Sequence, residues 1–114
     1  MIDPTIAARI ATILHALGES TRLRLIRVLT VGEQSVNALA AAVGSPVVNV
    51  SHHLGVLRNA GVLTVEKRGR QRVYALSADL FHNGQDGVLG EFRFDGCRVV
   101  LNGVHPGGGK KRKG

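Results

Sequence analysis

Two groups of side chains near the middle of the chain have the chemistry needed to contact nucleic acid. The first group follows a predicted helix break and consists of Ser45, Val48, Asn49, Ser51 and His52. An Asn side chain can make two hydrogen bonds to adenine, and Val can touch the methyl group of thymine. The second group lies near the tip of a predicted hairpin and consists of Arg68, Arg70 and Arg72. Arginines in that position could hold phosphates or enter a minor groove, so the two groups together predict contact with duplex DNA.

The segment Gly44-Ser45-Pro46 predicts that one helix ends and another begins within three residues. Gly44 can take the left-handed conformation that ends a helix. Ser45 can accept hydrogen bonds from the free amides of the next helix, and Pro46 fits its first position. We expect helices over 36–43 and from 46 to about 60. Two helices joined this tightly form a helix-turn-helix, whose second helix enters the major groove.

Apolar residues at helical spacing should hold these elements on a core. In the second helix of the pair they are Val50, Leu54 and Leu57, with His53 packed beside them. A first helix is expected over 4–17, with a stripe formed by Ile6, Ile10, Ile13, Leu14 and Leu17. His15 is expected on the packing side of this helix. The next helix along the chain, capped by Ser20, should bury Leu25, Ile26 and Leu29.

Strands are predicted in two later regions. Residues 62–67 and 71–76 flank Gly69 and form the basic hairpin, and 77–81 should make one helical turn. Asp95-Gly96 between 91–94 and 97–101 predicts a second hairpin. The expected fold class is α+β, mainly α: a winged helix-turn-helix with an additional C-terminal β-hairpin. The predicted divisions are 4–80 for the DNA-binding domain, 81–106 for the extension and 107–114 for a disordered basic tail.

Composition agrees with a small domain that binds a polyanion. The 114 residues carry 15 Lys and Arg against eight Asp and Glu, a formal charge of +7, and four of the basic residues lie in 110–113. The charge does not distinguish DNA from RNA or an anionic membrane. One cysteine and no long apolar run predict a reducing, cytoplasmic setting without a signal peptide or a membrane span. A small domain with an Ile-rich first helix also predicts a homodimer.

Three blocks of sequence resemble the ArsR/SmtB-type winged-helix transcriptional regulators. The blocks are 16–25, which reads ALGESTRLRL, 50–63, which reads VSHHLGVLRNAGVL, and Gly69-Arg70 followed by VYAL at 73–76. The resemblance covers about residues 10 to 80 of the chain. The resemblance implies a homodimeric repressor that occupies an inverted-repeat operator on double-stranded DNA until a signal releases it.

The resemblance does not extend to the family's sensor sites. Some members carry a cysteine pair on the third helix, but 36–43 contains no thiol. Others bind zinc through Asp and His on a C-terminal helix, and here that region predicts turns and a hairpin. His82, Cys97 and His105 lack ligand-like spacing, and Cys97 fits a small buried hydrophobe better than a redox switch. We therefore predict no metal, no cofactor and, because no catalytic arrangement is present, no enzyme.

Two other functions remain open from the sequence. A protein-interaction module could use the same fold without touching DNA, because a helix with a solvated polar side and an arginine-tipped hairpin are each common on their own. An RNA-binding domain is a third hypothesis, but the chain lacks a surface aromatic pair on which bases stack. The basic tail could grip phosphates or could be a solvated run of charge.

Overall fold

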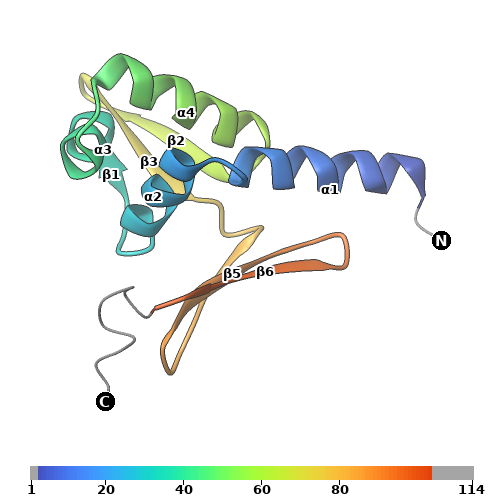
Figure 1. The fold of residues 1–114 in the computed structure, drawn as a ribbon. Helices are drawn as coiled ribbons and strands as arrows, with labels where there is room; N and C mark the ends of the chain where they lie inside the picture. The colour runs from blue at the N-terminus through green and yellow to red at the C-terminus, as the bar shows by residue number, and fades with distance from the viewer. Residues whose placement is uncertain (1–2, 104–114) are drawn as a thin grey trace.

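The computed structural model describes residues 3–103, which form four helices and two small antiparallel sheets (Figure 1). The helices are α1 (Pro4–Leu17), α2 (Ser20–Leu29), α3 (Val36–Val43) and α4 (Val47–Asn59). The strands are β1 (Gln34–Ser35), β2 (Leu63–Arg68), β3 (Gln71–Leu76), β4 (Phe81–Asn83), β5 (Val88–Phe94) and β6 (Cys97–Asn102). The expected class, an α+β winged helix-turn-helix, is confirmed. The predicted basic tail and His105 lie outside the described residues.

The helices pack through the residues that the apolar spacing indicates. Leu25 and Ile26 of α2 are fully buried, as are Val50, Leu54 and Leu57 of α4. The prediction was wrong at the start of α2. Ser20 is already helical, and the carboxylate of Glu19 caps the helix by accepting from the backbone N–H of Arg22 at 2.8 Å. An acidic cap also suits the positive end of the helix dipole.

The break between α3 and α4 confirms one part of the sequence prediction and corrects another. Gly44 adopts φ 66°, and the N–H of Ser45 donates to the carbonyl of Ala40, which closes the end of α3. Pro46 has ψ 146° and so precedes α4 as its N-cap residue instead of filling its first turn. No side chain caps α4, so the expected capping by Ser45 is wrong. The backbone N–H of Ser45 is used to end the previous helix.

The first sheet has the strand order β1-β3-β2 and forms the wing beside α4 (Figure 1). The pairing of Leu63 with Leu76 continues to Arg68 with Gln71, which leaves Gly69-Arg70 as a two-residue turn. Gly69 has φ 61°, a conformation that such a turn requires. The third strand, β1, was not predicted. It has only two residues, and its pairing with Val73 and Tyr74 of β3 defines it.

The second sheet has the order β4-β5-β6 and lies against the helices on the side away from α4 (Figure 1). The hairpin predicted around Asp95-Gly96 is confirmed, and both residues have positive φ values of 52° and 83°. One turn follows Ser77 as expected, but Phe81 then begins β4, which the sequence did not predict. Gly90 lets β5 approach the ring of Phe81, since a Cβ atom there would lie 2.3 Å from that ring.

The second sheet shares the hydrophobic core with the helices. Phe81, Phe92 and Phe94 are buried together with Ile13 and Leu17 of α1 in one cluster. Arg9 of α1 also pairs with Asp95 in the β5–β6 turn at 2.5 Å. The division of the chain at residue 80 therefore remains a prediction. Within residues 3–103, no helix has the length and apolar character needed to cross a membrane.

Candidate nucleic-acid interface

One face of α4 is buried and the opposite face is open to solvent. Val48 is 76% exposed, and Asn49, Ser51 and His52 are also exposed. Ser45, just before the helix, is half-buried. Because the inward residues fix the helix on the core, the exposed ones form a rigid surface of small polar and apolar groups. Four of the five predicted base-contacting residues therefore lie on one accessible surface.

The N-terminal end of α4 keeps polar groups available for a ligand. The first backbone N–H groups of a helix have no partner within the helix. Here the N-cap is Pro46, and no side chain accepts from them. Free amides at the positive end of a helix dipole attract anions such as phosphate. The end of α4 expected to approach a nucleic acid therefore has the polarity to do so.

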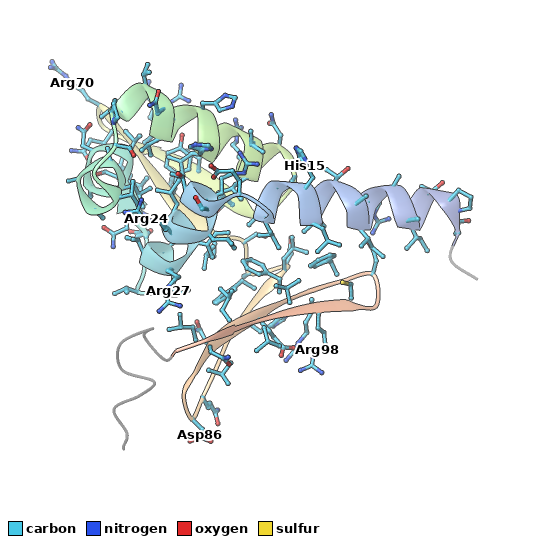
Figure 2. All side chains as sticks on the ribbon, in the orientation of Figure 1. His15, Arg24, Arg27, Arg70, Asp86 and Arg98 are labelled. Atoms are coloured by element: carbon cyan, nitrogen blue, oxygen red, sulfur yellow. The ribbon has the colours of Figure 1, made fainter. Side chains whose placement is uncertain are left out.

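The three arginines of the wing are placed differently. Arg70 extends from the tip of the β2–β3 hairpin away from the rest of the molecule (Figure 2). Arg68 instead donates to Glu33 through Nη1 and Nη2, and its Nη2 also donates to Glu66 at 2.8 Å. The Arg68 hydrogen bonds hold the pKa of the Glu33 carboxyl below its usual value. Arg68 would have to leave these partners to bind a phosphate, whereas Arg70 would not.

A basic hollow of about 330 Å³ lies between α4 and the wing. It is lined by Arg58, Val65, Lys67 and Arg72. Lys67 and Arg72 are opposite each other in the β2–β3 register, and Arg58 reaches the hollow from the last turn of α4. The sequence prediction included Arg72 but missed Arg58 and gave Lys67 no role. The β register could have indicated that Lys67 and Arg72 are neighbours, but only the packing of α4 on the wing adds Arg58.

A polar network holds the inner side of α4. Arg22 is 8% exposed, and its Nη1 lies 3.1 Å from Nδ1 of His53. The same guanidinium donates through Nε to the carbonyl of Ala16 at 2.7 Å. His53 is therefore mostly buried, as expected, but a buried arginine was not predicted beside it. The expected packing of His15 is wrong, because its side chain is exposed and only its backbone oxygen faces Arg22 (Figure 2).

Two of the residues considered as metal ligands, His82 and Cys97, lie in the part of the chain that the structure describes. Among the residues that the structure describes, no group of three or more His, Cys, Asp or Glu side chains is arranged to hold a metal ion. Cys97 is a half-buried free thiol opposite Phe94 in the second sheet. Its surroundings fit the packing role predicted for it.

Comparison with known proteins identifies the family of this chain. A helix-turn-helix domain family matches residues 17–66. The regulator NmtR of Mycobacterium tuberculosis is 40% identical over 75 residues, which is 66% of this chain. A crystal structure described as a possible transcriptional regulator for arsenical resistance is 45% identical, with a TM-score of 0.56 over 58% of this chain and 69% of its own. The chain belongs to the ArsR/SmtB family of winged helix-turn-helix proteins.

The likeness within the ArsR/SmtB family has clear limits. A homodimeric winged helix-turn-helix domain from Mycobacterium bovis, described as a possible ArsR-family regulator, is 26% identical with a TM-score of 0.63. That match covers 69% of this chain and 75% of the other. The match to NmtR covers 62% of the length of NmtR. The matched family segment, 17–66, ends before the second sheet of this ArsR/SmtB protein begins at residue 81.

Proposed function

We propose that this protein is a DNA-binding transcriptional repressor that places α4 in the major groove of an operator. The observation that carries the proposal is the arrangement of α4: its inner face is fixed on the core, and its outer face presents Asn49, Ser51 and His52 to solvent. Short side chains of this kind can reach base edges directly. The names of its relatives, which are transcriptional regulators and repressors, favour this function over a protein-interaction module.

The wing and the basic hollow would hold the sugar-phosphate backbone. In duplex DNA, the phosphates of one strand separate the major groove from the adjacent minor groove. With α4 in the major groove and Arg70 in the neighbouring minor groove, that strand would cross the hollow lined by Arg58, Lys67 and Arg72. These side chains would supply affinity that falls with salt and carries little sequence information.

We also propose that the repressor acts as a homodimer in the cytoplasm on an inverted-repeat operator. Two apolar residues of α1, Ile6 and Leu14, are 37% and 43% exposed in the single chain, which a second copy could cover. The Mycobacterium bovis neighbour is described as homodimeric. Two related copies of α4 would require two related half-sites, because operator symmetry mirrors protein symmetry.

The test is the salt dependence of binding to duplex DNA, measured by fluorescence anisotropy. We expect the parent protein to bind and Arg70→Gln/Arg72→Gln to bind more weakly. The slope of log affinity against log salt should flatten by about 0.9 for each phosphate that the variant no longer neutralises. A duplex of mixed sequence is sufficient, because binding to phosphates does not depend on sequence.

The control is Arg98→Gln on the second sheet, because it removes one arginine charge from a site remote from Arg70 (Figure 2). It should leave the slope unchanged. If the parent protein fails to bind duplex DNA even at low salt, the repressor proposal is wrong and the interaction-module hypothesis gains. Preferential binding to single-stranded RNA in competition would instead favour the third hypothesis.

A further inference from the structure

The guanidinium of Arg22 joins three helices behind the proposed DNA-reading face. Its Nε donates to Ala16 at the end of α1, at 2.7 Å, and its Nη2 lies 3.4 Å from the carbonyl of His15. The backbone N–H of Arg22 donates to the Glu19 carboxylate at the start of α2. Its Nη1 lies 3.1 Å from Nδ1 of His53 on α4. Arg22 thereby ties the position of α4 to the ends of two other helices.

The hydrogen bond between Arg22 and His53 depends on the protonation of the imidazole. Arginine has only donors, so Nδ1 of His53 must be unprotonated to accept from it. If the His53 ring were protonated, it and the Arg22 guanidinium would both be donors and both be positively charged. The His53 side chain is 19% exposed at this position. Glu19 Oε1 lies 3.8 Å from the same Nδ1 and could accept its proton in a hydrogen bond.

The charged surroundings of His53 come from two helices. Glu19 and Arg22 face the ring from α2, and the His52 ring on α4 lies 5.7 Å away between centroids. From α1 the network receives the carbonyl oxygens of Ala16 and His15. Protonation would therefore favour Glu19 over Arg22 as the partner of His53, which would weaken the link that Arg22 makes between α4 and the end of α1.

We propose that neutral His53 positions α4 for DNA and that uptake of a proton by His53 lowers the affinity for DNA. This inference rests on the proposed function, because Asn49, Ser51 and His52 of α4 are the groups proposed to contact bases. His53 acts through them and touches no base itself. Histidine is the side chain that ordinarily changes charge between pH 5 and 8, so DNA binding is compared across that range.

The test compares DNA affinity at about pH 8 and about pH 5.8, using a duplex that the His52→Gln protein selects from a random pool at the higher pH. All proteins carry His52→Gln, because protonation of an exposed His52 would itself strengthen binding to phosphates. We expect the affinity of the His52→Gln protein to fall about tenfold between the two values, as for the removal of one hydrogen bond to a charged group.

Two substitutions at His53 separate positioning from simple packing. His53→Asn places an oxygen near the Nδ1 position, and this oxygen accepts from Arg22 but does not take up a proton. It should bind within about threefold of the His52→Gln protein at about pH 8, with the pH dependence abolished. His53→Leu removes the acceptor and should bind about tenfold more weakly at both values. Equal affinity of the His53→Leu and His52→Gln proteins at about pH 8, or an unchanged pH dependence in the His53→Asn protein, would overturn the proposal.

A measurement without DNA distinguishes this proposal from the function on which it rests. In NMR spectra of the free protein, the backbone amides of α4 should shift together with protonation of the His53 ring. The His53→Asn protein should lack that shift. If the amides of α4 do not respond, the positioning proposal is wrong even when DNA binds. If they respond and no DNA binds at any pH, the repressor proposal is wrong and the conformational coupling remains.

Discussion

At the scale of single residues, charge alone does not decide which arginines are available to a ligand. Arg22 is buried among backbone carbonyls, and Arg68 is held by Glu33 and Glu66, whereas Arg70 is exposed at the wing tip. The sequence could indicate that the hairpin is basic. It could not assign these different roles, because Glu33 is 35 residues from Arg68 in the chain and His53 is 31 residues from Arg22.

The basic hollow leads to a prediction for Arg58, which the sequence did not single out. Arg58→Gln should weaken binding to two unrelated duplexes by the same factor, about threefold to tenfold, and flatten the salt slope by about 0.9. Arg58→Lys keeps the charge and should recover most of the affinity. Anisotropy titrations at several salt concentrations measure both quantities. A weakening confined to one duplex would mean that Arg58 reads sequence instead of holding the backbone.

At the scale of elements, the local sequence predicts those helices and hairpins whose ends are marked by residues that start a helix, end a helix or form a turn. The bounds of α1 and α3 agree with the sequence prediction, because Pro4 and Ser35 mark their starts and Gly18 and Gly44 follow their ends. The β5–β6 hairpin follows from Asp95-Gly96. Strands β1 and β4 were missed because they are only two and three residues long, and their pairing with the longer strands β3 and β5 defines them.

The second sheet leads to a prediction of acid sensitivity. Arg98 and then Arg93 hold the pKa of Glu91 down to about 2, from an ordinary value of 4.5. A carboxyl whose pKa is depressed by folding stabilises the fold above pH 4.5, and this stabilisation disappears as the pH falls towards 2. Glu91→Gln should therefore melt below the parent at pH 7, with a difference that shrinks between about pH 5 and pH 2. Thermal melts followed by circular dichroism test this. A difference that is the same at both ends of the range would contradict it.

At the scale of the whole molecule, the described chain leaves apolar surface that its own core does not cover. The stripe predicted on α1 divides, because Ile13 and Leu17 are buried while Ile6 and Leu14 remain more than one-third exposed. The sequence spacing grouped these residues on one stripe but could not distinguish the part that packs within one chain. The exposed part is the surface on which we expect a second copy, and two copies would present two α4 helices to one operator.

The measurement that tests the central proposal most directly is the selection and sequencing of duplexes bound from a random pool. We expect the parent protein to enrich an inverted repeat whose half-sites lie about 10 base pairs apart, or a multiple of that spacing. Asn49→Ala should keep the spacing but relax the preference at one position in each half-site, at a cost of about 1–3 kcal/mol. Enrichment of no sequence, or an Asn49→Ala protein that selects the same bases as the parent, would contradict the placement of α4 in the major groove.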